Sequence, residues 1–236
     1  MKIQILGTRG EIKPTAPYHA KHSGVLIDDY LMFDLGEKEF LSYKPKAIFI
    51  THLHPDHAFF VRDMRESIDS KIKIYAPERF KNIPMQVLTQ QWSSGPYMVT
   101  PIPTEHSIKV KSQAYLIQKG DKRILYTGDM FCIIKKYQKK LKKLGKLDLV
   151  ITEASFLREG GVIRRARLRD EELFGHAGIP NLIRFFKPYT KGILLMHFGS
   201  WFYQLGTRAA RVKIQELARR YDVKIYVGYD GLILCL

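Results

Sequence analysis

Thr51-His52-Leu53-His54-Pro55-Asp56-His57 brings three histidines and an aspartate together within six residues. It continues the apolar, β-branched run at 47–51, which is typical of a buried strand. Because side chains alternate faces along an extended chain, the first two histidines leave on the same side. The proline ends the extended path, and the turn carries the aspartate and the last histidine to a second position. The segment therefore offers two neighbouring ligand sets, as a site for two metal ions requires.

The composition is that of an ordinary globular protein. Hydrophobic residues make up 45% and aromatic residues 12% of the 236, which suits one domain spanning residues 1–236 and argues against a disordered chain. No apolar run is long enough to cross a bilayer, so no membrane partner is expected. Cys132 and Cys235 are the only cysteines, and two cysteines encode no disulfide framework. The expected location is therefore the reducing cytoplasm.

The net charge is strongly positive. Lys and Arg number 39 against 23 Asp and Glu, which gives a formal charge of +16 at pH 7. Such an excess favours anionic partners, namely nucleic acids, nucleotides or phosphate esters. A lysine-rich solvated surface of the kind found in hyperthermophiles is the alternative, although that bias usually includes Glu and leaves the charge nearer balance.

The pattern of apolar residues predicts an α+β fold. Strand-like segments lie at 2–6, 24–28, 30–34, 47–51, 71–76, 97–101, 113–118, 123–127, 147–152, 192–196 and 223–227. Helical spacing occurs at 131–144, 179–186 and 204–221. No fixed-period repeat and no Pro/Ser-rich linker divides the chain. Strand-rich halves with interspersed helices favour two packed sheets with helices outside, a four-layer αββα sandwich.

Three further metal-ligand side chains stand where hydrophobic strands end. His106 follows the apolar stretch at 97–103, and Asp129 and His197 each follow a later strand. Any one of them alone is typical of a hydrogen-bonded histidine or a turn aspartate. As a set, in this order after the first motif, they supply the ligands that the site still needs.

These residues resemble those of the metallo-β-lactamase superfamily, in the same order over nearly the whole chain. The resemblance implies two ligand sets bridged by Asp129: His52, His54 and His106 for one metal, and Asp56, His57 and His197 for the other. All seven positions are filled without substitution. No cysteine occupies a ligand position, which makes hydrolysis of β-lactam antibiotics an unexpected activity.

The residue types indicate which cofactors to expect. Imidazole and carboxylate ligands suit divalent transition metals, so two such ions are predicted, with zinc first and manganese or iron as alternatives. A metal-bridging hydroxide is a ready nucleophile near neutral pH, and the same cations hold the anionic oxygens of a substrate.

Two later segments resemble motifs of the tRNase Z branch. Glu153-Ala154-Ser155-Phe156 is similar to its Glu-Ala-Thr-Phe, and Gly175-His176-Ala177-Gly178 to its Gly-His-Ser-Thr. The resemblance implies that His176 stands near the scissile phosphate and that Glu153 orients it. Together with Asp56, these two are the predicted catalytic residues. From the residues alone, His176 could instead cap the following helix, and Glu153 could pair with a nearby arginine.

One interval departs from true tRNase Z. Those enzymes carry a protruding arm between the third histidine motif and the bridging aspartate, whereas Asp129 follows His106 by only 23 residues here. The interval is instead similar to that of armless relatives, which include a cyclic phosphodiesterase associated with phosphonate breakdown.

Basic residues near the predicted site are candidate substrate contacts, because guanidinium groups suit phosphate. One follows the first strand and the others lie between the two later motifs: Arg9, Arg164, Arg165 and Arg167. Residues 135–146 contain seven Lys and no acid, in a helical pattern with one apolar face. That run either binds nucleic acid or is a solvated helix face.

The sequence therefore predicts a metal-dependent hydrolase of phosphodiesters, acting on nucleic acid, a nucleotide or a small cyclic phosphate. The first alternative is a thioester or lactone hydrolase of the same superfamily. The second is a non-catalytic nucleic-acid-binding protein that keeps a structural metal site. A homodimer is compatible with this prediction, although no interface is identified in the sequence.

Overall fold

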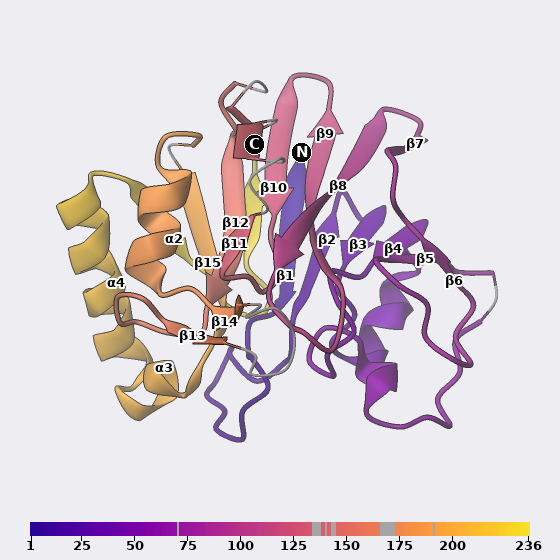
Figure 1. Ribbon diagram of the computed structural model, residues 1–236, viewed down its shortest axis with the longest axis horizontal. Coiled ribbons are helices and arrows are strands. Elements are labelled where there is room, and N and C mark those ends of the chain that lie inside the picture. The colour runs from indigo at the N-terminus through magenta and orange to yellow at the C-terminus, as the bar shows by residue number, and fades with distance from the viewer. Residues whose placement is uncertain (70, 134–137, 140, 143–144, 166–172, 191) are drawn as a thin grey trace.

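Two sheets packed face to face form the centre of the molecule (Figure 1). This computed structural model describes residues 1–236 except 70, 134–137, 140, 143–144, 166–172 and 191. The first sheet runs in the order β17 (Ile233–Cys235), β1 (Lys2–Gly7), β2 (Gly24–Ile27), β3 (Leu31–Phe33), β4 (Ala47–Phe49), β5 (Lys73–Ala76) and β6 (Met85–Val87). The C-terminal strand β17 thus returns to the first sheet beside β1.

The second sheet contains the strands from the middle and later parts of the chain. Its order is β11 (Cys132–Ile133), β8 (Tyr97–Glu105), β9 (Ser112–Lys119), β10 (Lys122–Tyr126), β12 (Leu149–Ala154), β15 (Gly192–Phe198) and β16 (Lys224–Val227). Strand β7 (Trp92–Ser94) also pairs with β8. From β10 to β16 the strands are parallel, so their C-terminal ends reach one edge of the sheet.

Helices cover the outer faces of both sheets. The second sheet is covered by α2 (Ile179–Phe186), α3 (Ser200–Gln204) and α4 (Thr207–Tyr221), at the left of Figure 1. Ile179, Leu182, Ile183 and Phe186 recur at helical spacing along α2 and are all buried. The first sheet is covered by the 3-10 helices η1 (Lys38–Tyr43) and η2 (Phe59–Val61).

Three apolar layers separate these four structural layers. The middle layer joins the two sheets, for example through Phe33, Phe49 and Tyr115, whose rings are in contact. One outer layer lies under α2 and α4, and the other lies under η1 and η2. The predicted α+β sandwich is confirmed, with short 3-10 helices in place of α-helices in the described part of one outer layer.

All strand segments that the sequence indicates contain a strand, and α2 has the predicted bounds. The helix expected at 131–144 is wrong at its beginning, because Cys132 and Ile133 form β11 on the free edge of β8. Residues 134–137, 140 and 143–144 of that segment lie outside the described residues. Of the others, 138–139 and 141–142 are helical, and Leu141 is buried against the second sheet.

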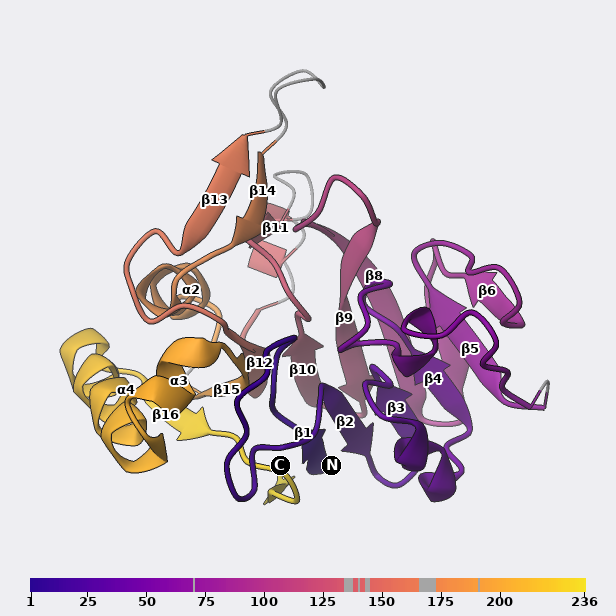
Figure 2. The ribbon, with the colours of Figure 1, turned by 90° about the horizontal axis from the view of Figure 1, so that it is seen from below.

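A separate hairpin stands beside the edge where the parallel strands end. It consists of β13 (Val162–Arg165) and β14 (Leu173–His176), and Figure 2 shows it projecting from the body of the molecule. Among the described residues, no helix has the length and apolar character that crossing a membrane demands.

Candidate metal centre

The seven predicted ligands converge at the edge where the two sheets meet. Those of the first motif follow β4, and the others follow β8, β10 or lie in β15. Their ligand atoms form two clusters: His52, His54 and His106 in one, and Asp56, His57, Asp129 and His197 in the other. Within each cluster these atoms lie within 4.8 Å of one another, although they come from segments up to 141 residues apart in the chain.

Three imidazole nitrogens face one another in the first cluster. His54 Nδ1 lies 3.0 Å from His52 Nε2 and 3.2 Å from His106 Nε2. Burial lowers the pKa of His52 and His106, and it lowers the pKa of His54 to about 4. The three rings are therefore neutral and present lone pairs to a common point, which is the form in which imidazole binds a metal.

The second cluster combines imidazole with carboxylate. His197 Nε2 lies 2.7 Å from Asp56 Oδ2, and His57 Nε2 lies 3.8 Å from the same oxygen. Burial alone would raise the pKa of Asp56, but His57 and His197 lower it well below its usual range. The side chain is therefore ionised, as a metal ligand must be.

Asp129 presents one carboxylate oxygen to each cluster. Oδ1 lies 3.3 Å from both His57 Nε2 and His197 Nδ1, and Oδ2 lies 3.9 Å from both His52 Nε2 and His106 Nε2. The preceding Gly128 has a φ of +57°, and a Cβ there would lie 2.5 Å from Thr51 Oγ1. Only glycine permits this close approach of β10 to β4, which brings Asp129 between the clusters.

Unpaired buried atoms indicate that the centre is built for a bound cation. Among the described residues, His57 Nε2 and Asp129 Oδ1 are buried and have no hydrogen-bond partner. A buried polar group without a partner is costly, so such atoms require a ligand. A divalent metal ion coordinated by these atoms satisfies them, and the donor set of imidazole and carboxylate fits zinc, manganese or iron.

Asp34 holds one of the metal-ligand histidines in place through a hydrogen bond. It was not among the residues that the sequence indicated. Its carboxylate is fully buried and accepts hydrogen bonds from His57 Nδ1 (2.7 Å), from the backbone N–H of Thr51 (2.7 Å) and from the Tyr126 hydroxyl (2.6 Å). The bond to Nδ1 leaves Nε2 of His57 as the metal-facing nitrogen. Its position directly after β3 is the same strand-end signal that indicated Asp129.

Glu153 and His176 lie together beside the metal ligands. His176 Nδ1 donates to Glu153 Oε2 at 2.7 Å, and Glu153 Oε1 accepts from the backbone N–H of Met130, also at 2.7 Å. The His176 ring is 4.6 Å from that of His106 between centroids, and its side chain is 24% exposed. Burial alone would lower the pKa of His176, but the Glu153 carboxylate raises it to about 9.

A small cavity of about 420 Å³ opens onto this group. Residues 10–12 of the N-terminal loop form one side, and Phe156, Ser155 and Gly199 form the other. His54, Asp56, Asp129, His176 and His197 also line it. Residues of both ligand clusters and His176 are therefore accessible to one reacting group in the cavity.

Arg9 is engaged in the N-terminal loop. Its guanidinium donates to the backbone oxygen of Ala20 at 2.7 Å and to that of Ile12. Ile12 lines the metal cavity, so Arg9 holds the loop that lines the cavity. A direct contact of Arg9 with substrate stays a prediction.

The other arginines lie on the projecting hairpin. In β13, Arg164 pairs with Phe174 two residues beyond the pair of Val162 and His176, and it shares the hairpin face of His176. Arg165 lies on the opposite face, and Arg167 lies outside the described residues. Their contacts with substrate stay predictions, as does a role for the lysine run at 135–146, part of which lies outside the described residues.

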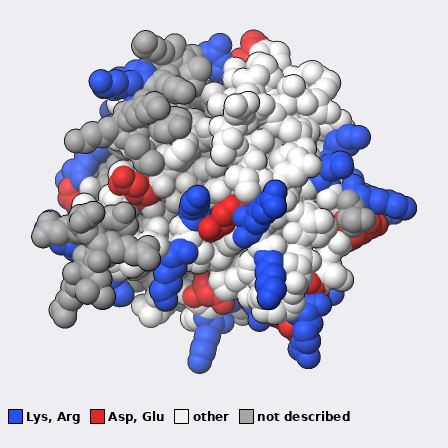
Figure 3. Space-filling view, turned by 45° about the vertical axis from the view of Figure 1, so that its right-hand side comes forward, with Lys and Arg blue, Asp and Glu red and all other residues white. Residues whose placement is uncertain are grey.

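Positive charge is spread over the described part of the face in Figure 3. On the face in Figure 3, Lys and Arg side chains stand singly or in small groups beside a broad uncharged area. The charge on this face therefore does not mark a binding patch by itself.

A family model described as "Beta-lactamase superfamily domain" matches residues 41–198, well over half of the chain. A search of curated proteins gave no significant match.

Solved structures match over almost the whole chain. The metallo-beta-lactamase fold protein YhfI from Bacillus subtilis has a TM-score of 0.68 and 18% identity, covering 99% of this chain and 98% of that one. The short form of human tRNase Z (ELAC1) gives 0.63 and 17%, covering 100% and 99%. A diphosphatase from the PhnP family gives 0.65 and 17%, covering 100% and 97%. At these identities the likeness establishes the fold alone.

Proposed function

The chain belongs to the beta-lactamase superfamily as a metal-dependent hydrolase, and we propose that the bond it hydrolyses is a phosphodiester. The observation that carries this proposal is the pair of Glu153 and His176 beside the metal ligands. Cleavage of a phosphodiester expels an alkoxide, which needs a proton or a cation close to the leaving oxygen. A thioester instead expels a thiolate, which leaves without such an acid.

The position and the charge of His176 support this role. The Glu153 carboxylate raises the pKa of His176 to about 9, so the ring is the imidazolium form at neutral pH. Its side chain lines the cavity onto which Asp56 and Asp129 also open. His176 can therefore donate a proton to an oxygen that leaves from a group held at the metal ligands.

The two clusters of ligands would add metal ions to the reaction. We propose that two divalent cations, zinc first, are held by the two clusters and bridged by Asp129. Bound there, they would activate water for attack and neutralise the negative charge of the phosphodiester. Glu153 keeps His176 oriented, and the N-terminal loop at 10–12 restricts access to the cavity.

The comparisons support the proposal without deciding the substrate. Two of the similar structures are a tRNase Z and a diphosphatase, whose names refer to reactions at RNA and at a diphosphate. The described hairpin β9–β10 fills the interval between His106 and Asp129, so no arm is present there. The short interval between His106 and Asp129 therefore fits a compact phosphodiesterase or nuclease without an arm.

The test is hydrolysis of a panel by zinc-loaded and manganese-loaded protein. The panel contains bis(p-nitrophenyl) phosphate, 2′,3′-cyclic nucleotides, short RNA and DNA, a thioester and a lactone. Asp129→Asn removes the bridging charge but keeps the side-chain shape, and we expect kcat/KM for the diesters to fall more than about a hundredfold. Asp121→Asn, at a fully solvated turn, is the matched control and should leave the rates unchanged.

Other outcomes point to the other candidate functions. Turnover of the thioester or lactone alone, surviving His176→Ala, would replace the diesterase by an acyl hydrolase. Binding of RNA or DNA without any hydrolysis under either metal would support a nucleic-acid-binding protein instead.

A further inference from the structure

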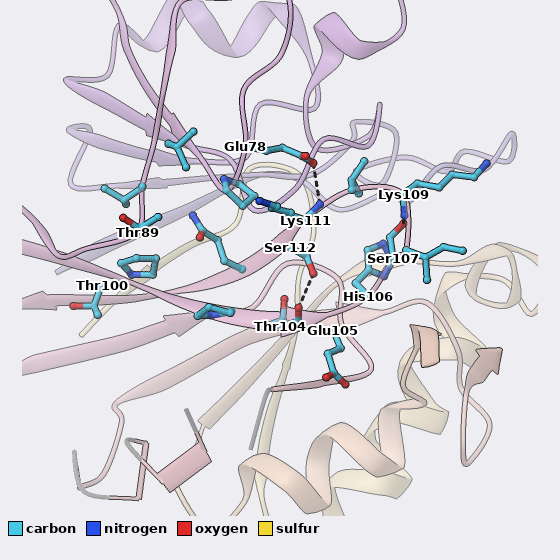
Figure 4. A pocket seen from close by; sticks show the side chains of 18 of the residues that line it. Glu78, Thr89, Thr100, Thr104, Glu105, His106, Ser107, Lys109, Lys111 and Ser112 are labelled. Atoms are coloured by element: carbon cyan, nitrogen blue, oxygen red, sulfur yellow. Dashed lines mark hydrogen bonds between the residues drawn. The ribbon is translucent and has the colours of Figure 1, made fainter. Parts of the chain in front are cut away.

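A groove of about 1160 Å³ lies next to the metal cavity. The two share no lining residue, and His106 stands between them: it lines the groove, and its ring contacts those of His54 and His176, which line the cavity. In Figure 4, Thr89 and Thr100 lie at one end of the groove, and His106 and Ser107 lie at the other. The groove therefore leads directly away from the ligands.

The groove is too large to serve only the reacting group. Pockets for small ligands commonly measure about 300–1,000 Å³. The metal cavity of about 420 Å³ is at the lower end of this range and suits the reacting phosphodiester. The adjoining groove exceeds it, so the two together suit a substrate that extends well beyond the scissile bond.

Both uncharged polar and apolar side chains line the groove. Thr89, Gln90, Gln91 and Thr100 supply hydroxyl and amide groups from β8 and the segment before β7. Flat apolar surface comes from three prolines and from neighbouring aliphatic residues: Pro77, Pro101, Pro103, Val87 and Leu88. This mixture matches a nucleoside, whose base has apolar faces and whose base edges and sugar form hydrogen bonds.

The groove lining carries two lysines, which form no ion pair among the described residues, and two glutamates. Lys109 and Lys111 are exposed and, within the described part of the chain, form no ion pair. Glu78 accepts a hydrogen bond from the backbone N–H of Lys111 at 2.9 Å, and Glu105 accepts one from the Cys132 thiol. Free ammonium groups beside a nucleoside site are suited to the next phosphate of a strand.

We propose that this groove binds a single strand of nucleic acid whose scissile phosphate lies at the metal centre. A nucleoside would occupy the part between Thr89 and Thr100, with the flanking phosphate near Lys109 and Lys111. The inference rests on the proposed phosphodiesterase function, and it names the substrate class for that site. A small cyclic phosphate would leave the groove empty.

The test compares a long and a short substrate. The ratio of kcat/KM for a single-stranded hexanucleotide to that for bis(p-nitrophenyl) phosphate isolates what the groove contributes. In Gln90→Ala/Lys109→Ala we expect this ratio to fall about tenfold. Thr100→Trp, which fills the groove from β8, should lower the ratio similarly without removing a charge.

The matched controls are Gln86→Ala and Lys73→Ala, which change exposed residues of β6 and β5 outside the groove. They should leave the ratio unchanged. An unchanged ratio in both groove variants, or an equal loss with both substrates, would overturn the groove proposal while leaving the diesterase intact.

Measurement of hexanucleotide binding tests the groove proposal separately from the proposed phosphodiesterase activity. If the wild type hydrolyses no phosphodiester, the proposed function is overturned, and fluorescence anisotropy with the labelled hexanucleotide then decides the groove. Weaker binding by Gln90→Ala/Lys109→Ala and Thr100→Trp than by the controls would uphold it. Equal binding by all of them would refute it.

Discussion

His176 depends on Glu153 for its charge at neutral pH. The carboxylate lies 2.7 Å from Nδ1 and raises the pKa of the ring to about 9, against the burial that would lower it. Two cations at the ligands would oppose this rise by repelling the imidazolium. A proton donor in this position loses activity as the pH rises through its pKa, because the neutral ring can no longer donate.

Replacing Glu153 by glutamine should move the alkaline limb of the pH–rate profile to lower pH. Gln keeps the bond to the Met130 N–H but offers no charge to His176, so the pKa of the ring falls towards or below its ordinary value. We expect the limb to shift by at least about one pH unit and kcat at pH 8 to fall about tenfold, with KM little changed.

Profiles of kcat and of kcat/KM against pH for a 2′,3′-cyclic nucleotide, whose leaving group is an alkoxide, measure the effect. Glu159→Gln removes a solvated carboxylate paired with Arg184 and should leave the limb in place. An alkaline limb that stays fixed in Glu153→Gln would exclude His176 as the proton donor.

Individual residues differ in how far the sequence reveals them. The ligands of the first motif are predictable because their spacing along one strand and turn sets their geometry. Asp34 is not predictable in the same way, because its role comes from Thr51, His57 and Tyr126, which two other segments of the chain bring to it. The bonds of Arg9 to loop oxygens likewise depend on how residues 10–22 fold back over β1.

At the scale of elements, the N-terminal loop is clamped through His19. The Thr8 hydroxyl donates its only proton to Asp230 at 2.8 Å, so it accepts from His19 Nδ1 at 3.0 Å. Nε2 must then accept from Arg211, 3.3 Å away. Burial and this guanidinium lower the pKa of His19 to about 4, and the ring is neutral in the folded protein.

The clamp predicts acid sensitivity of the fold. An unfolded His19 titrates near its ordinary pKa of about 6.5, so below that pH the unfolded chain binds a proton that the folded protein excludes. The stability that His19 contributes is full above pH 6.5 and is lost as the pH falls towards 4. His19→Asn should therefore be less stable than the wild type at pH 7.5, and this difference should narrow by pH 4.5.

Thermal melts of both proteins across this range provide the measurement. The difference between the two proteins is the informative quantity, since acid also protonates the metal ligands in both. A gap in Tm that stays constant from pH 7.5 to 4.5 would show that His19 does not titrate with folding.

The elements themselves are predictable where their apolar pattern is long enough. α2 is recognisable because its buried residues keep helical spacing over eight residues, and β15 because its seven residues are all buried. Strands β13 and β14 are of mixed polarity with exposed residues, and β17 has only three residues, two of them exposed. They exist because they pair with another strand, which is a property of the tertiary fold and not of their own sequence.

At the scale of the molecule, the metal centre lies across the junction of the sandwich. His52 follows a strand of the first sheet, whereas Asp129 and His197 belong to the end of the second. The backbone N–H of Gln113 in β9 donates to Thr51 O at 3.0 Å, which is a direct link between the sheets at this edge. Cations held by both sets of ligands would add further links between the two halves.

Removal of metal should therefore destabilise the whole fold. Saturating a folded-state site at a thousandfold excess over its Kd stabilises by about 4 kcal/mol, and about 1 kcal/mol shifts the Tm of a chain this size by about 2–4 °C. We expect zinc to raise the Tm of chelator-treated protein by about 10 °C or more, as measured by calorimetry. Asp129→Asn should reduce that shift by at least half, and Asp121→Asn should not. Equal melting with and without zinc would mean that the ligands of the two sheets are not joined by an ion.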